Sequence, residues 1–190
     1  MPQERSQPST IPTNTNKSSD DPIVGLYNTS TGQSTGGYNG RYSNSAEDPP
    51  NAIDGLLNTK CLNFGVQDND GFMLYNPGVN TFFFVTPTIS NASVAVALLF
   101  ATADEFPYRD PLTVTLEGTN ATDVEALHLG SSWTLIYSGP TGIDPARNTY
   151  MQQQDFSNTI AFRSYRLLVT SQEGLSNSVQ YAEAQILGHV

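Results

Sequence analysis

Cysteine is almost absent from this chain, and histidine is nearly so. The 190 residues contain one cysteine and two histidines, which excludes an internal disulfide and any zinc cluster built on several cysteines. The cysteine, Cys61, stands next to Leu62 and close to Phe64. We therefore expect it to be a small buried residue rather than a reactive thiol.

Basic side chains are also scarce. Eight Lys and Arg residues stand against 18 Asp and Glu residues, so the formal net charge is −10. Without a basic stripe to neutralise phosphates, nucleic acid is excluded as an expected partner, and binding to anionic membranes is disfavoured. The carboxylates suit a neutral ligand or a bound cation, while solubility alone is the simpler alternative.

Long hydrophobic runs are missing as well. The longest, Val94–Ala101, has the length of a strand and is too short to cross a membrane. The N-terminus lacks the basic start and apolar core of a signal peptide, so we interpret the sequence as a piece of a larger protein. Residues 1–20 are mostly Ser, Thr, Pro, Asn and Gln, which predicts a disordered linker before one domain over residues 21–190.

Short β-strands dominate what remains. In residues 112–117, apolar Leu and Val alternate with Thr and Glu, as expected of a half-buried strand. One short helical turn is expected within residues 49–58. Eight strands are predicted, over Ile23–Tyr27, 71–75, 81–86, Val94–Ala101, 112–117, 133–137, 165–170 and 179–187. Their even spacing, with Gly, Asn and Pro turns between them, predicts an all-β fold, an eight-stranded antiparallel jelly-roll sandwich.

Two segments carry a family resemblance. Residues 51–60 read NAIDGLLNTK, with Leu-Asn-Phe at 62–64, and residues 178–188 read SVQYAEAQILG. Further matches follow in the same order at 109–111, 116–120, Trp133, Arg147, 156–158 and 165–167. Together, over about residues 23–188, these resemble the discoidin, or coagulation factor 5/8 type C, family, which has a galactose-binding-like fold.

The resemblance implies a jelly roll with adjacent termini, attached to a larger extracellular or cell-surface protein. Members often hold a calcium ion at the loop that begins with Asp54. Carried over by position, the implied ligands are Asp54, Asn58, Thr59 and Glu183, with backbone oxygens of Ala52 or Lys60. A loop rich in oxygen donors also suits calcium chemically, although a plain Asx turn with a solvated carboxylate would have the same sequence.

A sugar-binding site needs an aromatic face beside polar groups. The first candidate is the loop containing Tyr38, Asn39, Arg41 and Tyr42. Two others place aromatic residues beside polar ones, namely Phe106 and Tyr108 with Asp104 and Arg109, and Tyr150 with Arg147 and Asn148. Packing of each aromatic ring against the barrel rim is the alternative, and both arginines match family positions that look structural.

No pair of carboxylates and no nucleophile beside a base suggests catalysis. We therefore predict a non-catalytic carbohydrate-binding or cell-adhesion module of an extracellular protein, with a structural calcium and a glycan or glycoprotein as partner. The alternative is a spacer or protein-interaction module without a small ligand. Four Asn-x-Ser/Thr motifs, at Asn16, Asn28, Asn91 and Asn120, would be glycosylation acceptors in a eukaryotic secretory pathway.

Overall fold

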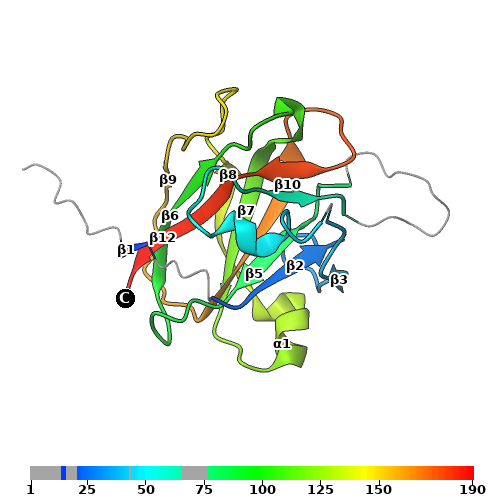
Figure 1. Cartoon of the computed structure of the whole chain (residues 1–190). Coiled ribbons are helices and arrows are strands. Elements are labelled where there is room, and N and C mark those ends of the chain that lie inside the picture. Colours follow the sequence, from blue (N-terminus) through cyan, green and yellow to red (C-terminus); the bar gives the residue numbers. More distant parts are fainter. Residues whose placement is uncertain (1–13, 16–20, 43, 66–76) are drawn as a thin grey trace, which may run out of the picture.

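The computed structural model describes residues 14–15, 21–42, 44–65 and 77–190. These residues form a β-sandwich in which two layers of antiparallel strands enclose the core (Figure 1). Seven strands have four or more residues, and the others are segments of two or three residues. The predicted all-β jelly-roll class is confirmed.

One layer is a six-stranded sheet. In order across the sheet, its strands are β3 (Gly37–Tyr38), β2 (Ile23–Tyr27), β5 (Phe82–Val85), β10 (Ser164–Gln172), β7 (Pro111–Thr119) and β8 (Thr134–Pro140). Every neighbouring pair is antiparallel. The long central strands β7 and β10 therefore form the rigid middle of this layer.

The other layer contains a four-stranded and a two-stranded sheet. The first has the order β1 (Asn14–Thr15), β12 (Glu183–His189), β6 (Val94–Ala101) and β9 (Gln154–Asp155), and the second pairs β11 (Val179–Tyr181) with β4 (Cys61–Asn63). Because Asn14 pairs with Gly188, the two ends of the described chain are adjacent.

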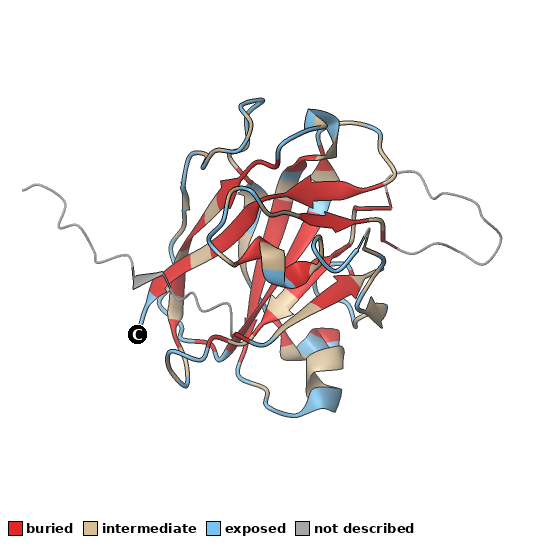
Figure 2. Cartoon of the chain, viewed as in Figure 1, coloured by how far each residue is buried: buried red, intermediate tan, exposed pale blue. Residues whose placement is uncertain are grey.

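The core lies between the layers, and most residues of the long strands are buried (Figure 2). Val114 and Leu116 of β7 are fully buried, as are Leu98 and Phe100 of β6. Each such apolar side chain contributes roughly 1.5–3 kcal/mol on burial. Aromatic rings add to this packing, and the rings of Phe82 and Tyr181 are stacked with centroids 4.3 Å apart.

Several strands and helices of the structure differ from those expected from the sequence. Residues 179–187 were expected to form one strand, but Ala182 separates β11 from β12, since β11 pairs with β4 and β12 with β6. A short helix, α1 (Val124–His128), was not expected. Asp123 caps its N-terminus, where the carboxylate accepts a hydrogen bond from the Glu125 N–H. The expected turn within 49–58 is the 3₁₀ helix η1 (Pro49–Ala52). The expected strand at 71–75 lies outside the described residues, and so do residues 1–13 and 16–20 of the predicted linker.

Residues 29–36 form a roof over the outer face of the six-stranded sheet. The roof covers a buried ion pair between Arg166 of β10 and Glu117 of β7, whose Nη2 and Oε2 atoms are 2.8 Å apart. The Gly32 N–H donates to Glu117 Oε1 at 2.9 Å, and Arg166 donates to the Gln33 carbonyl at 3.2 Å. Trp133 closes the side, with its ring centroid 4.7 Å from the guanidinium carbon. Polar contacts therefore attach the roof to the sheet.

Three loops meet at the end of the sandwich opposite α1, and we call them the loop end (Figure 1). They comprise residues 102–110, 141–150 and 172–178. The backbone of Gly174 donates to the Tyr108 carbonyl, and Asn148 donates to the Ala103 carbonyl. Backbone hydrogen bonds therefore hold all three loops together.

Candidate functional site

Phe106 occupies an unusual backbone conformation at the loop end. Its φ of 54° and ψ of 67° place a bulky side chain in the left-handed region, where such residues are uncommon and strained. The neighbouring contacts explain why it stays there. The Arg109 guanidinium lies 4.3 Å from the Phe106 ring centroid, and the buried Gln180 side chain donates to the carbonyl of Glu105.

Tyr108 extends this aromatic surface. Its ring centroid is 5.7 Å from that of Phe106, and 43% of the residue is exposed. Arg109 lies against both rings and donates from Nε to the Ser176 hydroxyl at 3.3 Å. Gly174 packs so closely that a Cβ there would lie 2.7 Å from the Cβ of Tyr108. The loop end thus presents two neighbouring aromatic rings, with the Arg109 guanidinium packed against them, closest to Phe106.

A polar hollow lies on the other side of Asp104 from this surface. It has a volume of about 320 Å³ and is bordered by three asparagines, Asn44, Asn58 and Asn148, together with Glu47, Lys60 and Asp104. Lys60 Nζ is 2.8 Å from Asp104 Oδ1, and its charge lowers the pKa of that carboxyl. The size is near the lower limit of small-ligand pockets.

The arginine of the third loop has a structural partner. Arg147 forms a bidentate ion pair with the buried carboxylate of Asp110, and this pair connects residues 141–150 to the start of β7. Burial raises the pKa of Asp110, and the Arg147 guanidinium opposes that shift. The structural role that the sequence analysis expected for Arg147 agrees with this geometry.

The structure separates the two tyrosines of the first predicted sugar site. Tyr38 faces outward, with its ring centroid 4.3 Å from that of His128 and 6.3 Å from that of Phe84. Tyr42 packs against the core, and its buried hydroxyl has no hydrogen-bond partner among the described residues. Between them, Asn39 and Gly40 both have positive φ and reverse the chain.

This separation corrects one part of the prediction. Tyr42 is not an exposed platform for a sugar, because its partly buried ring packs against the core and its hydroxyl is buried. Asn39 and Arg41 remain exposed, while Tyr38 is half-buried beside His128. The four residues therefore do not form one surface, and whether Tyr38 contacts a ligand stays a prediction.

The structure brings together three of the four predicted calcium ligands. Thr59 donates from Oγ1 to Asp54 Oδ2 at 2.8 Å, and Glu183 Oε1 accepts from the Gly55 N–H at 2.6 Å. Tyr150 lies near the carboxylates of Asp54 and Glu183. Burial raises the pKa of its hydroxyl most, and the two negative charges raise it further. Asn58, in contrast, is exposed and borders the polar hollow.

The donor set at this loop suits a hard cation. Asp54 and the fully buried Glu183 supply carboxylate oxygens, while Thr59 supplies a hydroxyl and Leu56 a carbonyl next to it. Calcium prefers such oxygen ligands. In the described part of the chain, no three His, Cys, Asp or Glu side chains are placed so that they could hold a metal ion, so a metal here would need the hydroxyl and carbonyl oxygens as well.

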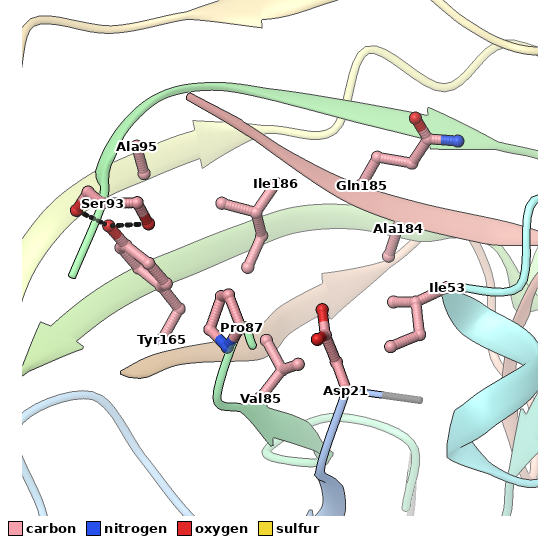
Figure 3. A pocket seen from close by; sticks show the side chains of 10 residues that line it. All are labelled: Asp21, Ile53, Val85, Pro87, Ser93, Ala95, Tyr165, Ala184, Gln185 and Ile186. Carbon is pink, nitrogen blue, oxygen red and sulfur yellow. Dashed lines mark hydrogen bonds between the residues drawn. The ribbon is translucent and has the colours of Figure 1, made fainter. Parts of the chain in front are cut away.

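A second, smaller cavity lies between the layers of the sandwich and is lined by ten residues (Figure 3). Its walls are mainly apolar, with the Asp21 carboxylate directed toward it and Tyr165 bonded to Ser93 at one side. The volume of about 30 Å³ holds only about two water molecules. A sugar ring does not fit there.

Comparison with known proteins gives a consistent fold. No family model and no curated protein sequence matches the chain. Solved structures do match, and one is the CBM32-3 module of a family 31 glycoside hydrolase from Clostridium perfringens, with 16% identity and a TM-score of 0.56. That alignment covers 77% of this chain and 85% of the module. The chain has the galactose-binding-like fold.

Two further structures extend this likeness. One is the CBM32-5 module of CpGH89 from Clostridium perfringens, in complex with GalNAc-β-1,3-galactose, with 11% identity, a TM-score of 0.55 and coverage of 87% of this chain and 94% of the module. The other is chitosan-binding module 1 of a chitosanase/glucanase from Paenibacillus sp. IK-5, with 11% identity, a TM-score of 0.56 and coverage of 93% and 98%. The galactose-binding-like assignment made from the sequence is confirmed.

Sequence reasoning named the aromatic residues of the loop end but ranked them below the Tyr38 loop. It missed the polar hollow, because Lys60 and Asp104 meet only in the folded chain. The mixed signal of an aromatic pair flanked by Asp, Glu and Arg was visible at 104–109. Separately, none of the helices in the described residues is long and apolar enough to span a bilayer.

Proposed function

We propose that this chain is a non-catalytic carbohydrate-binding module of a larger extracellular protein and that it binds glycans at its loop end. The carrying observation is the pair of Phe106 and Tyr108, held in place around Arg109 beside a polar hollow. The fold supports the proposal, since matched structures are carbohydrate-binding modules, two of them with a glycan named as ligand. Extracellular placement and attachment to other domains are part of the proposal, and the origin of matched modules in glycoside hydrolases supports them.

The chemistry of the surface explains the preference for sugars. A pyranose presents an apolar C–H face that packs on an aromatic ring, while its hydroxyls need donors and acceptors at the edge. Tyr108 provides the exposed ring, and Asp104 and Ser176 provide polar edges. Because backbone hydrogen bonds already hold these loops, little ordering entropy opposes binding.

Alanine variants test this assignment. Tyr108→Ala should weaken binding of galactose- or N-acetylgalactosamine-containing disaccharides by roughly five- to thirtyfold, because about 1–2 kcal/mol of ring contact is lost. Isothermal titration calorimetry, with oligosaccharides chosen from a glycan array, measures the change. Tyr38→Ala is the matched control, since it removes a tyrosine at a distant part of the surface.

The outcomes separate the alternatives. Loss of binding in Tyr38→Ala with retention in Tyr108→Ala would move the site to the loop first predicted from the sequence. Absence of binding to every glycan on the array would instead support the spacer or protein-interaction alternative. Equal loss in both variants, with unchanged melting temperatures, would refute a single site at the loop end.

We further propose that a calcium ion braces the loop of residues 54–59. Asp54, Thr59 and Glu183 would hold it with nearby carbonyl oxygens, and the ion would neutralise two adjacent carboxylates. Its role would be structural, joining the loop of residues 54–59 to β12.

Calcium should then raise the melting temperature. Binding to the folded state alone adds about 2.7 kcal/mol when the free ion is at a hundred times its dissociation constant. Differential scanning calorimetry with calcium and with a chelator measures this shift. Asp54→Asn should abolish it, whereas Asp144→Asn, a substitution of an exposed aspartate at the loop end, should leave it intact. A melting temperature that is unchanged by both calcium and chelator would refute the proposed calcium site.

A further inference from the structure

The polar hollow carries an excess of negative charge. Lys60 Nζ lies 2.8 Å from Asp104, 3.6 Å from Glu105 and 3.8 Å from Glu47. Lys60 and these three carboxylates together carry a net charge of −2, and Glu47, Lys60 and Asp104 among them border the hollow. In addition, Glu47 Oε2 is buried and has no hydrogen-bond partner among the described residues.

The arginines of the neighbouring loops do not offset this charge. Arg147 is paired with Asp110, and Arg109 lies against the rings of Phe106 and Tyr108. The hydrogen bond and charge of Lys60 lower the pKa of Asp104, so this carboxylate stays ionised in mild acid. A positively charged ligand is therefore attracted to the hollow and an anionic ligand is repelled.

The other walls of the hollow suit hydroxyl groups. Asn44, Asn58 and Asn148 come from three separate segments and border the same space. Each amide can both donate and accept hydrogen bonds. The volume of about 320 Å³ admits a sugar ring, and a charged amine on that ring would reach the carboxylates.

We propose that this hollow binds a sugar with a free amine, a glucosamine-type residue, and that the module prefers cationic glycans over neutral and anionic ones. This inference rests on the proposed carbohydrate-binding function and specifies its ligand class. The ammonium group would pair with Asp104 and Glu47 beside Lys60, while the amides hold the ring hydroxyls. A neighbouring sugar of the same chain would then lie toward Phe106 and Tyr108.

Two oligosaccharides that differ only in charge test the preference. Glucosamine oligomers and their N-acetylated counterparts share one skeleton, and the amines are protonated in mildly acidic buffer. Calorimetry should show tighter binding of the free-amine oligomer, by roughly two- to fivefold for each exposed carboxylate that contributes. The difference should shrink as salt is added, because salt screens exposed charges. Oligogalacturonate, an anionic oligomer, should bind most weakly.

A charge-neutral variant locates the preference. Asp104→Asn with Glu105→Gln keeps side-chain size, and both positions are more than half exposed, so folding should be preserved. It should make the two glucosamine oligomers bind alike. The control is Asp123→Asn with Glu125→Gln at α1, which changes the net charge equally at the opposite end of the sandwich and keeps a good N-cap.

The results distinguish this inference from the function on which it rests. Equal affinity of the wild-type protein for both oligomers would refute the amine preference and leave carbohydrate binding intact. An equal loss of preference in the α1 control would also refute it, by assigning the effect to overall charge. Failure of the wild-type protein to bind any glycan on the array would overturn both proposals.

Discussion

The buried ion pair under the roof allows a sharp test of how the outer face is stabilised. Arg166 and Glu117 are 0% and 1% exposed, so neither charge reaches water. Replacing one partner leaves the other charged and buried. We therefore expect Glu117→Leu and Arg166→Met each to lower the free energy of unfolding by about 3–5 kcal/mol.

The double variant should be far less damaging than the sum of the single ones. It removes both charges together and loses mainly two hydrogen bonds to the roof, from Gly32 and to Gln33. At about 0.5–1.5 kcal/mol each, these bonds amount to about 1–3 kcal/mol. The single variants sum to at least about 6 kcal/mol, so the coupling energy should be at least about 3 kcal/mol.

Urea unfolding of the wild-type protein, the two single variants and the double variant completes this double-mutant cycle. The single tryptophan, Trp133, lies against Arg166 and reports on the outer face, while circular dichroism reports on the whole sandwich. A double variant as unstable as the two single variants combined would refute the reasoning. The roof would then depend on its hydroxyl and backbone contacts, such as Thr31 with Thr115, rather than on the ion pair.

Three further predictions concern the core. Gly25→Ala should lower the free energy of unfolding by about 1–3 kcal/mol, because the added Cβ would lie 1.8 Å from the Tyr42 hydroxyl. Adding Tyr42→Phe should recover part of the lost stability in a melting assay. If no stability is recovered, the clash is with the Asn39 backbone instead. Cys61 should resist alkylation at neutral pH and react only in denaturant, since burial raises the pKa of its thiol to about 12; rapid labelling of the native protein would contradict its position. Trp133→Phe should lower the free energy of unfolding in urea by about 1–2 kcal/mol, because the hydrogen bond from the indole N–H to the Leu127 carbonyl and the contact with Arg166 are lost. An unchanged unfolding midpoint would argue that neither interaction stabilises the fold.

The strands were predictable because burial on one face imposes a pattern on the sequence. Val114 and Leu116 alternate with threonines on β7, and the structure places both apolar residues in the core and Thr115 against the roof, where it is hydrogen-bonded to Thr31. The division at Ala182 has no such signal. Residues 179–187 are buried almost continuously, polar residues included, so no exposed position marks where the chain leaves β4 and joins β6.

The candidate site was less predictable because its parts come from distant segments. The Asn39-Gly40 pair is a strong turn signal, and its positive φ angles explain why Tyr38 and Tyr42 face opposite sides. That signal could have corrected the first sugar site. By contrast, only the family resemblance could connect Asp54 with Glu183, and nothing in the sequence connects Lys60 with Asp104.

The loop end is rigid for a reason that lies within the sandwich. Gln180, which holds the carbonyl before Phe106, belongs to β11, and its neighbour Tyr181 is stacked in the core on Phe82. The strained backbone of Phe106 is thus connected through Gln180 to a strand that packs in the core, and the packing there offsets the cost of the strain. Under the proposed function, a surface fixed in this way would lose little entropy on binding, but its small area would limit the affinity of one module. If the host protein carries several such modules, their combined avidity would supply the strength that one loop end lacks.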